Sequence, residues 1–115
     1  MKKSSIINVK TDVHECYACT RPHARESEKD LEARLVKEIG KRGGLTIKLT
    51  SQFHKGLPDR LVLVEGRPAL FAEIKTTGKK RTKLQELAGA KLEELGFSVA
   101  VIDCTEDLNQ FIDSL

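Results

Sequence analysis

Residues 57–75 read LPDRLVLVEGRPALFAEIK and hold two apolar runs separated by a turn-forming segment. The runs, 60–64 and 69–74, have the length and the aliphatic character of β-strands. The letters EGRP between them predict a hairpin. Such a hairpin would place Asp59, at the start of the first run, beside Glu73, near the end of the second. This stretch therefore predicts an antiparallel strand pair with two acids at one end.

A helix is expected before this hairpin. Ser27 is its expected N-cap, and Gly43-Gly44 is its expected end. Apolar side chains recur at helical spacing between these limits. They are Leu31, Leu35, Val36 and Ile39. Residues 45–49 then alternate between apolar and polar side chains, which predicts a half-exposed strand.

A second helix is expected after the basic loop 78–83, ending at Leu95 with Gly96 beyond it. Five side chains make the face that we expect it to bury: Leu84, Leu87, Ala88, Leu92 and Leu95. Residues 97–102 read as a short buried strand, and 106–113 fit a final helix.

The expected order is therefore α, β, β, β, α, β with a terminal helix, and the last α–β pair favours a mixed sheet. A chain of 115 residues fits one α/β domain, which we place at 27–115. Residues 1–26 lack clear periodicity and are expected to form an arm or a small appended element. The apolar runs are too short to span a bilayer, and no signal-peptide core follows the first lysines. These features predict a cytoplasmic protein, not a secreted one.

The net charge of +3 is mild and decides nothing about partners by itself. The distribution of charge says more, because a dense basic run is available for phosphate contacts, although such a run is also common on a solvated surface. The run comprises Lys79, Lys80, Arg81 and Lys83. With one tyrosine and no tryptophan, base-stacking platforms are not expected.

Glu73 and Lys75 lie two residues apart at the end of a strand, so their side chains share one face. A surface ion pair would explain these two residues, and a turn aspartate would explain Asp59. Two neighbouring carboxylates repel each other, however, and a bound cation relieves that repulsion. Oxygen ligands with positions open to water and phosphate suit Mg²⁺ or Mn²⁺.

Glu32 projects in the direction of the apolar stripe of the first helix, where a charge is costly unless it is paired or ligates something. It is therefore the third candidate acid. Gln85 lies at the edge of the second helix's apolar face, where it could reach into a site or be a plain boundary residue.

These groups would support metal-assisted hydrolysis of a phosphodiester. Asp59, Glu73 and the backbone carbonyl of Ile74 would hold one or two cations. Lys75 would orient or activate the water and offset charge in the transition state. The side chains expected to hold the DNA backbone are Lys48, Arg60, Lys79, Lys80, Arg81 and Lys83.

A separate Cys/His cluster lies near the N-terminus. It comprises His14, Cys16, Cys19 and His23, and Cys-x-x-Cys is half of a zinc site. The spacing is tight and lacks a distant second pair, so a structural Zn²⁺ and a plain polar arm both stay open.

Pro58-Asp59, a gap of 13 residues and then Glu73-Ile74-Lys75 resembles the signature of the PD-(D/E)XK nucleases. Across residues 28–103 the chain is similar to their virus-type replication-repair branch, the VRR-NUC domain, in its stand-alone form. The further matches are Leu31-Glu32-x-x-Leu35, Gly43-Gly44, Lys48, Gly56-x-Pro58-Asp59-Arg60, Gln85 and Gly96-Phe97.

The resemblance implies a restriction-endonuclease-like αβββαβ core and a Mg²⁺- or Mn²⁺-dependent endodeoxyribonuclease without a small-molecule cofactor. It implies metal ligands at Glu32, Asp59 and Glu73, a catalytic lysine at Lys75 and an associated site residue at Gln85. It also implies a homodimer acting in DNA repair on branched DNA such as four-way (Holliday) junctions, in a host cytoplasm if the source is viral. Two alternatives remain: a catalytically silent nucleic-acid-binding or assembly module with this fold, and a generic α/β domain with ordinary ion pairs.

Overall fold

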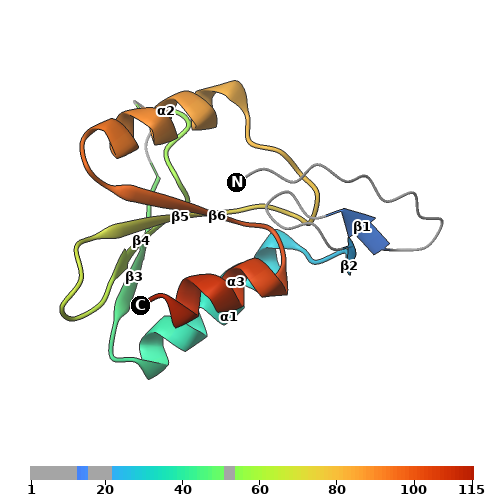
Figure 1. The fold of residues 1–115 in the computed structure, drawn as a ribbon, viewed down its shortest axis with the longest axis horizontal. Helices are drawn as coiled ribbons and strands as arrows, with labels where there is room; N and C mark the ends of the chain where they lie inside the picture. Colours follow the sequence, from blue (N-terminus) through green and yellow to red (C-terminus); the bar gives the residue numbers. More distant parts are fainter. Residues whose placement is uncertain (1–12, 16–21, 51–53) are drawn as a thin grey trace.

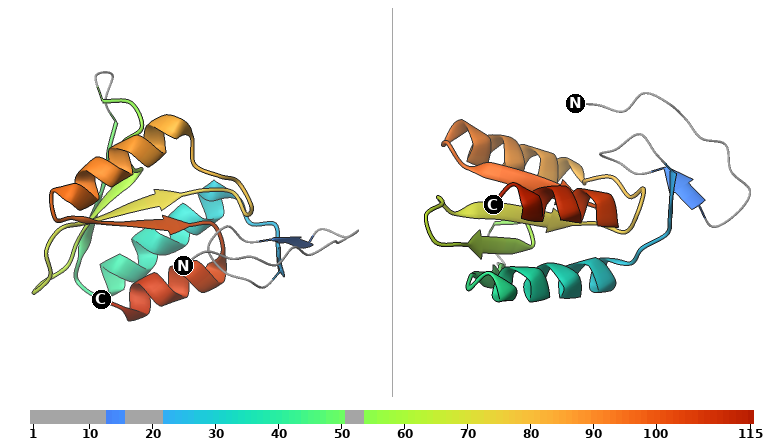
Figure 2. Two further views of the ribbon diagram at one scale, coloured as in Figure 1. Left: turned by 45° about the horizontal axis from the view of Figure 1, so that its top comes forward. Right: turned by 60° about the horizontal axis from the view of Figure 1, so that its bottom comes forward.

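The computed structural model describes residues 13–15, 22–50 and 54–115, and its centre is a four-stranded mixed sheet with helices on both faces (Figures 1 and 2). The sheet comprises β3 (Leu45–Lys48), β4 (Arg60–Leu63), β5 (Leu70–Ile74) and β6 (Ser98–Ile102), side by side in that order. The first three strands are antiparallel neighbours, whereas β6 runs parallel to β5. The expected α/β class, element order and mixed sheet are confirmed.

Two helices, α1 (Glu28–Lys41) and α3 (Thr105–Asp113), lie together on one face of the sheet, and α2 (Lys83–Glu94) covers the other (Figures 1 and 2). A separate two-stranded sheet of β1 (Val13–Glu15) and β2 (Pro22–Ala24) stands to one side. Within the described residues, none of the helices combines the length and apolar character needed to cross a bilayer.

The core lies between the sheet and the α1–α3 pair. From the helices it takes Leu31, Leu35, Ile39, Leu108 and Ile112, and from the strands Val62, Leu70, Ala72, Ile74 and Ile102. Alternation along β5 directs Leu70, Ala72 and Ile74 into this core, so Phe71 and Glu73 face the α2 side. The strand alternation thus determines which face receives the acid.

Helix α1 begins as the sequence predicts: the Ser27 hydroxyl accepts a hydrogen bond from the Asp30 amide at 3.1 Å. Its apolar stripe is narrower than expected, because Val36 stays 38% exposed while Leu31, Leu35 and Ile39 are fully buried. Val36 lies at the margin of the stripe, beyond the contact with the sheet and α3.

The expected buried face of α2 is wrong for three leucines. Leu84, Leu87 and Leu95 are 51%, 58% and 61% exposed. The residue of α2 that is buried is Gly89, so these three leucines stay largely outside the part of the helix that the rest of the protein covers.

The last strand is also less buried than expected. Phe97 is 40% exposed and precedes β6, whose burial is complete only at its Ile102 end. The reason is topological, because β6 is an edge strand of the sheet.

Candidate metal and nucleic-acid site

The hairpin brings Asp59 against the end of β5. In the β4–β5 register Arg60 is opposite Ala72, so the residue before β4 meets the residues that close β5. The Ile74 amide donates a 2.7 Å hydrogen bond to Oδ2 of Asp59. One oxygen of the Asp59 carboxylate is therefore fixed to the strand that carries Glu73.

Glu73 is a fully buried acid on the face that α2 covers. Its Oε2 lies 3.3 Å from Nε of Arg81, and its Oε1 is buried without a hydrogen-bond partner among the described residues. A buried acceptor without a partner is costly, and a cation bound there would remove the cost. This orphaned oxygen makes Glu73 fit the role of a metal ligand.

The electrostatics of Glu73 reflect this setting. Burial raises the pKa of its carboxyl above the ordinary value of 4.5; the charges of Arg81 and Lys75 act against the rise, and Asp59 adds to it. Lys75 is only 9% exposed, and its amide continues the parallel ladder by donating to the Ile102 carbonyl at 2.9 Å. The structure thus gathers Asp59, Glu73 and Lys75 at the end of β5.

A test of this burial is the pH dependence of stability without metal. The folded protein holds the Glu73 proton more tightly than the unfolded chain does. The protonated Glu73 carboxyl therefore contributes fully to the stability of the fold below the unfolded-state pKa. This contribution is lost as the pH rises through the raised pKa of the folded state. In EDTA, Glu73→Gln should raise Tm at pH 8, and the gain should shrink towards pH 4. A gain equal to that of the exposed Glu65→Gln at every pH would contradict this account.

Glu32 has a different environment from the other two acids. Its Oε2 accepts a 2.7 Å ion-paired hydrogen bond from Nε of Arg60, and the two side chains are 24% and 17% exposed. The pair joins α1 to the start of β4, next to Asp59 in the chain. Glu32 is therefore near the site in the fold, but its carboxylate is held by an arginine.

Gln85 is engaged at the start of α2. Its side-chain oxygen accepts a hydrogen bond from the backbone amide of Thr82 at 2.9 Å. The backbone amide of Gln85 in turn donates to the Thr82 hydroxyl at 3.1 Å. This is a capping box, and Thr82-x-x-Gln85 is the sequence pattern that signals one. The side chain thus has a structural role in fixing the first turn of α2.

The six side chains expected to contact a DNA backbone fall into two groups. The lysines are exposed: Lys48, Lys79, Lys80 and Lys83. The two arginines are turned inward instead, Arg60 to Glu32 and Arg81 to Glu73. The lysines therefore lie on the surface, whereas the two arginines are ion-paired with Glu32 and Glu73.

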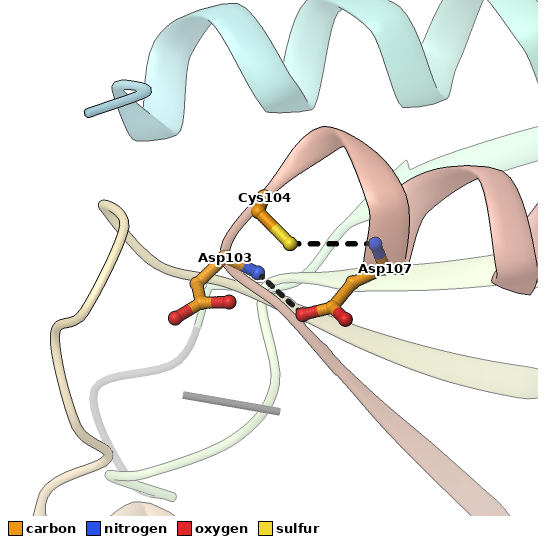
Figure 3. Close-up of side chains that lie close together, drawn as sticks. All are labelled: Asp103, Cys104 and Asp107. Carbon is orange, nitrogen blue, oxygen red and sulfur yellow. Dashed lines mark hydrogen bonds between the residues drawn. The ribbon is translucent and has the colours of Figure 1, made fainter. Parts of the chain in front are cut away.

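A second group of possible ligands lies where β6 leads into α3 (Figure 3). In the described part of the chain, one set of at least three His, Cys, Asp or Glu side chains has all its ligand atoms within 4.8 Å of one another: Asp103, Cys104 and Asp107. This buried cluster could hold a metal ion. The expected trio of Glu32, Asp59 and Glu73 is not drawn together this tightly.

The cluster also has hydrogen-bonding roles in the fold. The Cys104 sulfur is the N-cap of α3 and accepts from the Asp107 amide at 3.4 Å, and Oδ2 of Asp103 accepts from the Gly78 amide at 3.0 Å. Sequence analysis did not include Asp103, Cys104 and Asp107 among the candidate ligands, because it looked for acids around the 60–64 and 69–74 runs and on the first helix. The available signal was Asp103-Cys104-x-x-Asp107 directly after a core strand, at a helix start.

Thr77 links this cluster to the segment that leaves β5. Its buried hydroxyl donates to the Asp103 carbonyl at 2.7 Å and accepts from the Glu26 amide at 2.9 Å. Thr77→Val keeps the shape but leaves both groups without this partner, so it should lower the free energy of unfolding by about 2 kcal/mol. Urea denaturation measures the loss. A loss no greater than that of the exposed Thr50→Val would show that the hydroxyl is dispensable.

The structure describes only part of the predicted zinc cluster. Cys16 and Cys19 lie outside the described residues, while the β1–β2 register pairs the backbones of His14 and His23. A zinc site at these four residues stays a prediction, and measuring the zinc content of the purified protein would test it.

No protein-family model matches the chain. Over 88 residues it is 36% identical to "Putative nuclease p44" of Acyrthosiphon pisum secondary endosymbiont phage 1, covering 76% of this chain and 94% of that protein. Among solved structures it resembles one described as "VRR_NUC domain", with a TM-score of 0.70 and 21% identity, covering 76% of this chain and 97% of that one.

Proposed function

Because the chain belongs to the VRR-NUC family of nucleases, we propose that it is a Mg²⁺- or Mn²⁺-dependent endonuclease that hydrolyses DNA phosphodiester bonds, with its active site at the end of β5. The observation that carries the proposal is the Glu73 carboxylate, which is buried beside Asp59 and Lys75 and whose Oε1 has no hydrogen-bond partner in the part of the chain that the structure describes. The two acids could hold a cation for metal-assisted hydrolysis, and the lysine could stabilise negative charge on the phosphate.

Asp59 and Glu73 would hold the cation, with the Ile74 carbonyl and Glu32 as further oxygen ligands. A divalent ion bound there polarises a phosphate and makes a bound water more acidic. Asp59 is suited to this task because the Ile74 amide fixes one of its oxygens and leaves the other available. Glu32 would have to release Arg60 before it could bind the cation.

Lys75 would act on the reacting groups themselves. It follows Glu73 by two residues and is nearly buried, so its ammonium is held in a site with little competing water. A fixed positive charge there would orient the attacking water and stabilise negative charge on the phosphate as the bond breaks. Gln85 would contribute by fixing the start of α2 over the site.

The exposed lysines of the 79–83 loop and Lys48 would hold the DNA backbone, which positions the duplex without reading its sequence. The substrate that we propose is branched DNA, such as a four-way junction, and the acting form a homodimer, whose two-fold symmetry suits such a branch. The phage source of the relative is consistent with action in a host cytoplasm.

The surface of α2 offers an interface for that dimer. A groove of about 730 Å³ runs between α2 and the segment 54–57, and its walls are mainly apolar. They are formed by His54, Lys55, Leu57, Leu84, Ala88, Lys91, Leu92 and Leu95. Exposed leucines beside an apolar groove are typical of a surface that another chain covers.

The test combines cleavage with molecular mass. A four-way junction, a flap, a nicked duplex and a plain duplex of one sequence are incubated with Mg²⁺, Mn²⁺ or EDTA. We expect cleavage of the junction with either metal, none in EDTA, and a dimeric mass by light scattering. Tight junction binding without cleavage would instead support the silent-module alternative. A monomeric mass with no cleavage of the junction would contradict the dimeric junction nuclease.

A further inference from the structure

The Arg81 side chain lies in a fixed position between Glu73 of β5 and Gly89 of α2, which we call the Arg81 seat. Its Nε lies 3.3 Å from Oε2 of Glu73, and one terminal nitrogen donates to the Gln85 carbonyl at 3.1 Å. The side chain is 18% exposed, unlike those of Lys79, Lys80 and Lys83 around it in the sequence. A guanidinium held at two of its nitrogens has a fixed orientation, which a lysine could not reproduce.

Gly89 makes room for this guanidinium. It is buried in the middle of α2, where glycine weakens a helix relative to alanine. A Cβ at this position would overlap the terminal nitrogen of Arg81. Gly40, a glycine in α1, offers a contrast because a Cβ there would meet no described residue within 4 Å. Close packing against the Arg81 guanidinium therefore explains why a glycine occupies this position in α2.

The seat has a consequence for Glu73. Arg81 holds Oε2, while Oε1 is buried and has no hydrogen-bond partner within residues 13–15, 22–50 and 54–115. A carboxylate anchored through one oxygen cannot rotate freely, so its other oxygen keeps one direction. Groups that hydrogen-bond to metal ligands orient them, and their loss commonly lowers metal affinity by about 10- to 100-fold.

We propose that Arg81, seated over Gly89, is a positioning residue that orients Glu73 for the cation. The inference rests on the proposed function, since it takes Glu73 to be a metal ligand. Simple charge repulsion makes the opposite prediction: removing a positive group beside a divalent cation should strengthen binding. The sign of the change in metal affinity therefore separates a positioning role from a passive neighbouring charge.

The experiment measures Mn²⁺ binding by electron paramagnetic resonance, without DNA, in the full chain. The binding that Glu73→Gln removes is assigned to this site, which separates it from any ion at Asp103, Cys104 and Asp107. We expect Arg81→Ala to weaken that binding by about 10-fold or more, and Arg81→Lys to restore little of it.

Gly89→Ala provides the matched test, because it keeps Arg81 and its charge but fills the seat. Gly89→Ala should weaken Mn²⁺ binding as much as Arg81→Ala does, while its Tm should be unchanged or higher. The double variant that combines Arg81→Ala with Gly89→Ala should show no further loss of Mn²⁺ binding. Gly40→Ala, the control, should leave binding unchanged.

Equal or tighter Mn²⁺ binding in Arg81→Ala, or wild-type binding in Gly89→Ala, would overturn the positioning role. Wild-type protein that shows no binding sensitive to Glu73→Gln would instead overturn the proposed metal site itself. The two failures are thus distinguishable.

Discussion

Asp59→Ala and Lys75→Ala are each expected to lower the rate of DNA cleavage by about 100-fold or more. In the proposed site, Asp59 would offer the cation one carboxylate oxygen while its other oxygen is held by the Ile74 amide, and alanine removes both oxygens. Lys75 places a positive charge beside the buried Glu73, where a charge acts more strongly than in water. Initial rates on a labelled four-way junction with Mg²⁺ measure both losses.

Folding must be intact for these losses to bear on the site. Circular dichroism and thermal unfolding should therefore accompany each rate. Lys80→Ala is the matched control, because Lys80 is an exposed lysine of the neighbouring basic loop. It should weaken DNA binding modestly and leave the rate at saturating DNA close to that of the wild type. Wild-type rates in both Asp59→Ala and Lys75→Ala would show that the chemistry lies elsewhere.

Gly56→Ala is expected to lower the free energy of unfolding by about 2–4 kcal/mol. Gly56 has φ +89°, a conformation that alanine adopts only with strain, and a Cβ there would overlap the backbone carbonyl of Leu84. Because the overlapping atoms belong to the backbone, a side-chain rotation cannot relieve the clash and the backbone itself would have to shift. Since Gly56 precedes Pro58-Asp59, the change should also displace the acid and reduce cleavage.

Gly43→Ala separates the two contributions. Gly43 has φ +75°, but a Cβ there would meet no atom of the described residues within 4 Å. It should therefore cost only the conformational strain, about 1 kcal/mol. Urea denaturation of the two variants gives the comparison. Equal losses would mean that the close approach of the segment before Asp59 to α2 has no energetic consequence.

Much of the fold could be predicted from the sequence because its local signals agree with its long-range pairing. Ser27 caps α1, the letters EGRP join β4 to β5, and the closing α–β pair gives the parallel β5–β6 neighbours. Each of these signals depends on a few adjacent residues. The meeting of Asp59 with the end of β5 follows from the hairpin alone.

The surface of α2 could not be predicted in this way. Periodicity shows that Leu84, Leu87 and Leu95 are apolar and gather near one side of the helix, but not how much of that side the sheet reaches. Burial of an amphipathic helix depends on its partner, and the sequence pattern of the helix does not contain the partner.

The ion-pair partners of the site residues could not be predicted from the sequence either. Arg81 reads as one member of a basic run, yet its guanidinium turns away from the surface towards Glu73. Glu32 stands on the apolar side of α1 as expected, yet it meets Arg60. Both pairings join residues from different elements, so they depend on the packing of the helices against the sheet.

Two groups of acids in the described residues could hold a divalent ion: the pair Asp59 and Glu73, and the cluster of Asp103, Cys104 and Asp107. Anomalous diffraction from crystals grown with Mn²⁺ distinguishes them directly. The account predicts a peak beside Oε1 of Glu73 and the Asp59 carboxylate. A peak at the Asp103 cluster alone, with Glu73 without metal, would contradict the assignment of the catalytic centre to the end of β5.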